Sequence, residues 1–204
     1  MSRPYRILVK KTVREEVRAG DRSTLRLNLD DILPQERMKE VLGQVLERNG
    51  WREIAEGIYE KRRENGERMT CDLEEYEVVT TIELEDRLEE EVSQELRGDR
   101  WNWRLRRELT DAELEELRRQ AEAELERQAI TEEQREQARK NLRYEALRRL
   151  EESEPERRRE INKLVLEVYS EALKEKARQL GNVQGVEEGW KNEEEYELVI
   201  SLSE

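Results

Sequence analysis

Histidine is absent from the 204-residue sequence, and Cys71 is its only cysteine. Without histidine, the chain lacks the usual general base of serine and cysteine triads and the commonest metal ligand. A single cysteine excludes an intramolecular disulfide scaffold. Because Cys71 alternates in phase with Met69 and Leu73, we expect a buried structural thiol. These absences predict a protein that is not an enzyme and that has no cofactor and no metal site.

Long apolar runs are also missing from the sequence. No stretch of 18 consecutive apolar residues is present, so no segment has the composition of a membrane-spanning helix. The first five residues, Met-Ser-Arg-Pro-Tyr, lack the apolar stretch of a signal peptide. These features predict a soluble, cytoplasmic protein.

Charged residues make up 45% of the chain, and the formal net charge is −13. An acidic balance of this size repels phosphate backbones and anionic membranes, and it suits protein partners with basic surfaces. Several acidic runs could suggest paired catalytic carboxylates or a Mg²⁺ site. Since they lie on the polar phase of strands and helices, we interpret them as solvated faces. The runs are 74–77, 89–91 and 193–195.

The first 85 residues alternate between strand and helix signals. Apolar residues at odd positions, with a turn signal at 19–21, predict a β-hairpin over residues 5–29. Residues 34–49 have the spacing of an amphipathic helix that ends at Asn49-Gly50, with Asp30 or Asp31 as its cap. A second hairpin turns at Asn65-Gly66. Its outgoing strand changes phase near 74–75, which indicates a bulge or two separate strands.

A helical region is predicted from residue 86. Leu88, Val92 and Leu96 are spaced i, i+4, i+8, and Gly98 interrupts them. Capping boxes then begin three helices, and the last helix stops at Gly181. The apolar stripes of the first two are thin, which suits a helical hairpin that projects from the body or pairs with another chain. The three boxes start at Thr110, Thr131 and Ser153.

The end of the chain returns to a strand pattern. Residues 194–202 match residues 74–82 at five of nine positions, and each copy follows a helix that ends in glycine. A duplicated module whose two strands pair in pseudo-symmetric positions would explain this echo, as would chance similarity between two glutamate-rich strands. In both cases we expect the C-terminal strand to join the N-terminal sheet. Trp51 and Trp190 are expected to close the ends of the core.

The sequence therefore predicts an α+β fold. We expect an antiparallel sheet built from the N-terminal and C-terminal hairpins, with packed helices and a long helical hairpin inserted between them. The expected regions are an α+β sheet at 1–85, helices at 86–180, and a C-terminal hairpin at 181–204 that returns to the sheet.

Residues 97–107 are basic and aromatic in an otherwise acidic chain. Arginine and tryptophan are enriched at interface hot spots, and they also stack bases and hold phosphates. The alternative is a linker whose tryptophans pack on the domain and whose arginines form ion pairs with nearby carboxylates. We select six residues as candidate partner contacts: Arg100, Trp101, Trp103, Arg104, Arg106 and Arg107.

The strand–hairpin–helix order and the tail at 172–202, ALKEKARQLGNVQGVEEGWKNEEEYELVISL, resemble small α+β accessory proteins found beside MoxR-type AAA+ ATPases and von Willebrand A proteins. This resemblance rests on no catalytic motif. It implies an adaptor or regulatory subunit of an ATPase system.

A non-enzymatic protein-interaction module is the function that these observations favour: an adaptor, assembly subunit or regulator, with protein partners or a second copy of the chain. An acidic inhibitor or nucleic-acid mimic that occupies a basic groove is the main alternative, and it requires acids clustered on one continuous face. A carboxylate-based enzyme is the third, and it requires a pair of carboxylates that converge in a pocket with a raised pKa.

Overall fold

The computed structural model describes residues 4–102, 104, 107–191 and 196–203. The chain forms two compact units, one made of residues 1–19 and 84–145 and the other of residues 20–83 and 146–204. Both units contain helix and strand, as the predicted α+β class requires. No helix in the described part of the chain has the length and apolar character needed to cross a membrane.

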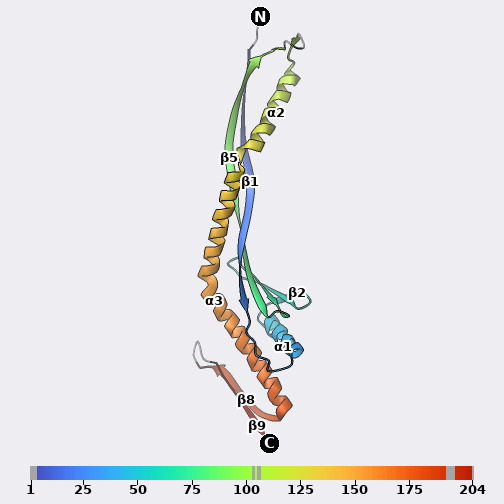
Figure 1. Ribbon diagram of the computed structural model, residues 1–204, viewed down its shortest axis with the longest axis vertical. Helices are drawn as coiled ribbons and strands as arrows, with labels where there is room; N and C mark the ends of the chain where they lie inside the picture. Colours follow the sequence, from blue (N-terminus) through green and yellow to red (C-terminus); the bar gives the residue numbers. More distant parts are fainter. Residues whose placement is uncertain (1–3, 103, 105–106, 192–195, 204) are drawn as a thin grey trace. The chain divides into compact units, whose positions relative to one another are not determined.

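Strand β1 (Pro4–Arg26) is continuous, so the predicted hairpin over residues 5–29 is wrong. β1 runs without a break in Figure 1, and Gly20 of the expected turn lies within its bounds. An added Cβ there would overlap the carbonyl oxygen of Ile82 and come within 3.2 Å of the Cα of Glu83. This glycine therefore permits a close approach of the neighbouring strand, β5 (Glu77–Asp99), and does not reverse the chain.

β5 also corrects the prediction that helix begins at residue 86, because it continues to Asp99. Residues four apart share a face in a strand as well as in a helix. The spacing of Leu88, Val92 and Leu96 therefore fits both structures. The two strands pair along their length, and an added Cβ at Gly98 would lie 2.6 Å from the ring of Tyr5.

Helix α2 (Asp111–Ala129) begins with the predicted capping box, in which the Thr110 side chain and the Glu113 side chain each accept a backbone N–H. Helix α3 (Glu132–Leu180) begins after Thr131, which exchanges the same bonds with Gln134. These two helix starts, and the stop before Gly181, are confirmed. The third start at Ser153 is wrong, because α3 continues through Pro155.

In the first unit, α2 and the first part of α3 run along β1 and do not form the predicted helical hairpin. Lys11 forms an ion pair with Glu126 of α2, and Glu15 forms one with Arg135 of α3. Four residues of strand and nine residues of helix both advance about 13 Å. Helix α2 and the first part of α3 therefore follow β1 in one direction without folding back (Figure 1).

The second unit contains the main core. A five-stranded antiparallel sheet has the order β1-β5-β4-β3-β2, with β2 at Arg52–Ala55, β3 at Ile58–Arg62 and β4 at Arg68–Asp72. Gly66 has the positive φ expected of the Asn65-Gly66 turn between β3 and β4, and a turn separates β4 from β5. One face of the sheet packs on α1 (Gln35–Arg48) and on α3. Trp51 belongs to this core, as expected. Helix α1 starts after Pro34 with no side-chain cap, so the Asp30 or Asp31 cap is wrong.

The C-terminal hairpin does not join the N-terminal sheet, and that expectation is wrong for the described residues. Strands β8 (Asn182–Trp190) and β9 (Tyr196–Ser203) pair with each other as a separate two-stranded sheet. β5 and β9, which carry most of the sequence echo, therefore lie in different sheets, and residues 192–195 are outside the described part. Trp190 is 44% exposed and packs edge-on against Tyr196 with ring centroids 5.3 Å apart, so it does not close a core.

Candidate functional site

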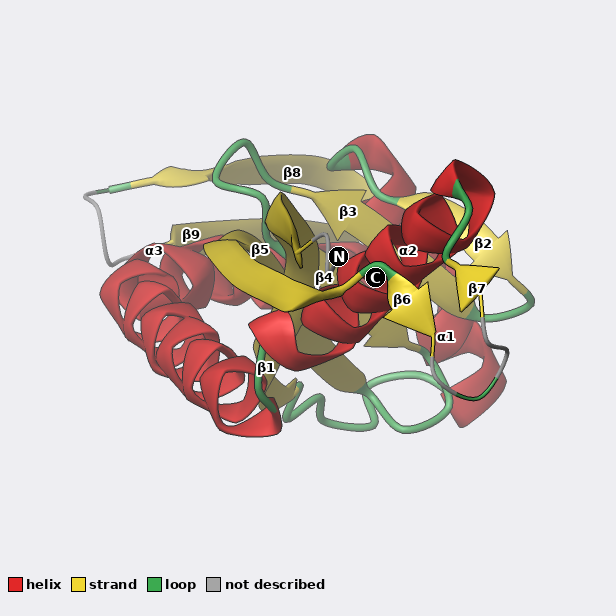
Figure 2. Cartoon of the chain, turned by 90° about the horizontal axis from the view of Figure 1, so that it is seen from above, coloured by secondary structure: helices red, strands yellow, loops and turns green. Residues whose placement is uncertain are grey.

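The arginine- and tryptophan-rich segment forms a small paired loop before α2. β6 (Trp101–Asn102) and β7 (Arg107–Glu108) are antiparallel, with Trp101 opposite Glu108 (Figure 2). The Trp101 side chain is partly exposed. Of the six predicted contact residues, the structure describes Arg100, Trp101, Arg104 and Arg107. The other two, Trp103 and Arg106, lie outside the described residues.

Two of these arginines pair with carboxylates in the first turn of α2. Arg100 Nη2 lies 2.7 Å from Asp111 Oδ1, and the two terminal nitrogens of Arg107 lie 2.6 and 2.8 Å from the Glu113 oxygens. The hydrogen bonds from Arg107, together with those at Thr110, lower the pKa of Glu113 to about 2. Arg100 and Arg107 therefore hold the loop to its own helix, whereas Trp101 and Arg104 have exposed surface for a partner.

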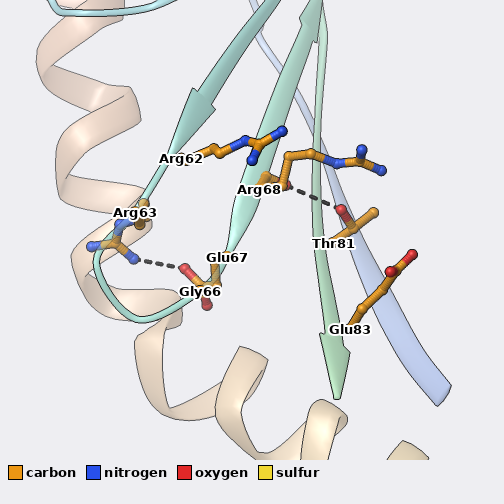
Figure 3. A pocket seen from close by; sticks show the side chains of 7 residues that line it. All are labelled: Arg62, Arg63, Gly66, Glu67, Arg68, Thr81 and Glu83. Carbon is orange, nitrogen blue, oxygen red and sulfur yellow. Dashed lines mark hydrogen bonds and ion pairs between the residues drawn. The ribbon is translucent and has the colours of Figure 1, made fainter. Parts of the chain in front are cut away.

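An open pocket of about 370 Å³ lies beside the β3–β4 turn (Figure 3). Arg62 and Arg68 are directly opposite each other in the register, and Thr81 is opposite Arg68 on β5. Glu60 forms ion pairs with both arginines, because its two oxygens lie 3.0 Å from Arg62 Nε and 4.0 Å from Arg68 Nε. Both of these arginines on the pocket lining therefore have a carboxylate of the same sheet within 4.0 Å.

Beneath this pocket, Glu67 is fully buried in an ion-pair cluster. Arg63 Nη1 and Arg157 Nη1 each lie 2.8 Å from its oxygens, and the Ser153 hydroxyl donates to it. Burial raises the pKa of Glu67, but the hydrogen bonds from Ser153, Arg63 and Asn65 outweigh burial and lower it overall. No sequence signal marked Glu67, which is one of 52 acidic residues. Ser153, the predicted helix cap, instead donates its hydroxyl to Glu67 beside the β3–β4 turn.

A second cluster attaches the C-terminal hairpin to α3. Glu188 of β8 accepts hydrogen bonds from Lys174 at 2.8 Å, Ser170 at 2.7 Å and Tyr196 at 2.6 Å. These bonds, that from Lys174 first, lower the pKa of Glu188 to about 2. The carboxylate therefore stays ionised and links helix and hairpin at neutral pH.

The Cys71 thiol and the acidic residues of the described part of the chain are the groups for which the structure can be compared with the expectations from the sequence. Cys71 is completely buried, and burial raises the pKa of its thiol to about 12. In the described part of the chain, no three acidic or cysteine side chains come together as a metal site would require. Every described carboxyl group whose pKa departs clearly from its ordinary value has a lowered pKa. These groups are Glu15, Glu67, Glu113, Glu175 and Glu188.

Comparison with known proteins supplies the family. No curated protein and no solved structure matches the chain. The family model described as FtsH ternary system domain X5 matches residues 1–203. FtsH is an AAA+ protease, so the family agrees with the expected link to an ATPase system, although it does not specify MoxR or von Willebrand A proteins. Because the match spans nearly the whole sequence, the chain belongs to the FtsH ternary system domain X5 family.

Proposed function

We propose that the chain is a non-catalytic accessory subunit that binds protein partners within an FtsH-containing ATPase system. The match of residues 1–203 to the family carries this proposal. The resemblance of the tail at 172–202 to accessory proteins beside MoxR-type ATPases and von Willebrand A proteins points the same way, and proteins of those two classes are partners to test alongside FtsH.

The ionisation of the described carboxylates supports a binding role over a catalytic one. A carboxylic acid that donates a proton at neutral pH needs a raised pKa. The displaced carboxyl groups of this chain have lowered values instead, because basic side chains bond to them. Such groups fix neighbouring elements, as Glu113 fixes the loop before α2 and Glu188 fixes the hairpin.

Charge on the solvent face of the first unit favours an adaptor over a nucleic-acid mimic. Arg14 lies 3.0 Å from Glu89, and Arg18 lies 2.8 Å from Glu85, across the β1–β5 pair. A mimic needs one continuous acidic surface, whereas here basic side chains of β1 alternate with acidic side chains of β5. The described face therefore has mixed charge, which suits contact with folded proteins.

The loop that precedes α2 is the contact surface we propose for this role. Trp101 is 38% exposed, and Arg104 on the same loop is exposed as well. Aromatic and arginine side chains contribute most to many protein interfaces. Trp103 and Arg106 complete the proposed contact set, and Arg100 and Arg107 support it by holding the loop to α2.

Reconstitution with the FtsH-family protease and the other proteins of the same system tests the proposal. We expect the purified chain to bind at least one of them in biolayer interferometry and to change its rate of ATP hydrolysis or proteolysis. Trp101→Ala should weaken binding at least ten-fold, whereas Trp190→Ala, a partly exposed tryptophan elsewhere, should not. Absence of binding to every protein of the system would overturn the proposal.

A further inference from the structure

The C-terminal hairpin has an open sheet edge along β9. In the described part of the chain, β8 and β9 form a sheet of two strands, so each strand has a neighbour on one side only (Figure 1). Ser170 and Lys174 of α3 hold this hairpin through Glu188 of β8. The outward N–H and C=O groups of an open edge can pair with a strand of another chain. Because a two-stranded sheet is only marginally stable in water, a further strand would stabilise it.

β9 lacks the features that protect edge strands in native proteins, which are proline, lysine, bulges and very short length. β2, at one edge of the five-stranded sheet, has four residues and a register shift. β8 also contains a register shift. β9 has eight residues with neither proline nor lysine, and Glu197 is its only charged residue. Its edge is therefore suited to pairing with another strand.

The sequence echo gives β9 a counterpart inside the same chain, residues 77–82 of β5. Both are the second strand of an antiparallel hairpin. Glu77 is opposite Asp72 of β4, and the aligned Glu197 is opposite Gly189 of β8. β5, however, also has β1 on its other side. The echoed sequence therefore forms a strand that is paired on both edges in β5 and on one edge in β9.

The exposure of the echoed valines and leucine reflects this difference. Val79 is partly buried, whereas the identical aligned residue Val199 is 45% exposed. Val78 is 2% exposed, whereas the aligned Leu198 is only partly buried. A strand laid along the free edge of β9 would cover both of these side chains, as β1 and β4 flank their counterparts in β5.

We propose that β9 pairs with β9 of a second copy of the chain, antiparallel and with a two-fold axis at Val199, so that two hairpins form one four-stranded sheet. In this register Val199 faces Val199 of the second copy, Leu198 faces its Ile200, and Glu197 faces its Ser201. Apolar residues thus face apolar residues, and no two like charges are directly opposite, so the strand is complementary to itself. The inference goes beyond the proposed function, because the partner is the chain itself.

This dimer should be weak and should respond to salt. One added strand on each side buries less than the roughly 1,600 Å² of a standard interface, so we expect a Kd on the order of 10–100 µM. Each copy carries a net charge of −13, and salt screens the repulsion between the copies. Dimerisation should therefore strengthen as the salt concentration rises, opposite to the binding of a basic partner.

The test is sedimentation equilibrium of the purified full chain across the micromolar range, at about 50 and 500 mM salt. Val199→Lys should weaken dimerisation at least ten-fold, because two ammonium groups are then directly opposite. Within one copy the new lysine is opposite Glu187, so the hairpin itself is retained. The matched control is Ile54→Lys, which changes charge equally at an exposed β-branched residue of β2 and should dimerise as the wild-type chain does.

Mixing two variants tests the register itself. An equimolar mixture of Val199→Lys and Val199→Glu should associate more tightly than either variant alone, because opposite charges then face each other across the two-fold axis. This comparison also covers the case in which a single variant dimerises poorly because its own hairpin is weakened.

Three results would overturn the β9 assignment: a wild-type chain that stays monomeric at both salt concentrations, equal weakening by Ile54→Lys and Val199→Lys, or a mixture that associates no better than its components. The experiment uses the chain alone, so it is separate from the accessory role. A monomeric chain that still binds a protein of the FtsH system rejects only the dimer, and a dimer that binds none of them rejects only the accessory role.

Discussion

Single side chains connect elements that are distant in the sequence, and Glu67 and Gly20 show two ways in which they do so. Glu67 follows the β3–β4 turn and reaches Ser153 and Arg157 of α3, about ninety positions later. Gly20 allows the β1 backbone to lie against β5. Glu67 acts through a buried charge, and Gly20 acts through the absence of a side chain.

Glu67→Gln should lower the free energy of unfolding by about 3–5 kcal/mol. The amide keeps the shape of the side chain, but Arg157 is then left as a buried charge without its carboxylate. Urea denaturation followed by circular dichroism measures the change. Glu64→Gln, on the exposed side of the same turn, should change stability by less than about 0.5 kcal/mol. A loss below about 1 kcal/mol for Glu67→Gln would contradict the buried ion pair.

Gly20→Ala should destabilise the protein by about 1–3 kcal/mol, because the new methyl group meets backbone atoms of Ile82 and Glu83 that cannot move separately from β5. Gly185→Ala is the matched control, since an added Cβ at Gly185 meets nothing within 4 Å. Thermal unfolding of the two variants compares them directly. Equal melting temperatures would contradict the close approach of β1 and β5 at Gly20.

At the scale of elements, the spacing of apolar residues located the amphipathic segments but did not always distinguish helix from strand. β5 was read as strand up to residue 85 and as helix beyond it, because residues four apart share a face in both structures. The two threonine capping boxes were reliable because in each the hydroxyl oxygen accepts the backbone N–H of the residue three positions later, at a true helix start. The segment that starts at Ser153 also fits the capping-box pattern, but it lies inside α3, and its hydroxyl donates a hydrogen bond to Glu67.

The attachment of the C-terminal hairpin to α3 should depend on pH. The pKa of Glu188 is lowered from 4.5 to about 2 by bonds from Lys174, Tyr196 and Ser170. A carboxyl group with a lowered pKa adds stability that is complete above its unfolded value and is lost as the pH falls through its folded value. The protection factors of the β8 and β9 amides, which correct for the slower intrinsic exchange in acid, should therefore fall between about pH 4.5 and pH 2.

The variant Glu188→Gln supplies the control for this titration. It removes the charge at every pH, so its hairpin amides should have lower protection factors at pH 7 and should lose the additional decrease in acid. Exchange that is the same in wild type and variant across the range would show that Glu188 does not hold the hairpin.

For the whole molecule, the net charge of −13 governs the approach to partners. Association with a basic protein of the FtsH system should slow at least several-fold as the salt concentration rises from 50 to 500 mM, because the Debye length shortens from roughly 14 to 4 Å. Stopped-flow measurements at several salt concentrations test this. Association rates that do not respond to salt would contradict electrostatic steering.

The sequence by itself determined the α+β class, the buried Cys71, helix α1 and the helix starts after Thr110 and Thr131. Each of these follows from local spacing or from one short hydrogen-bonded motif. It also singled out the arginine- and tryptophan-rich loop from composition alone. Only the tertiary structure decided that β1 continues through Gly20, that β5 extends to Asp99 and that β8 and β9 form their own sheet. It alone placed Glu67 in a buried ion-pair cluster, because strand pairing and burial depend on contacts between residues that are far apart along the chain.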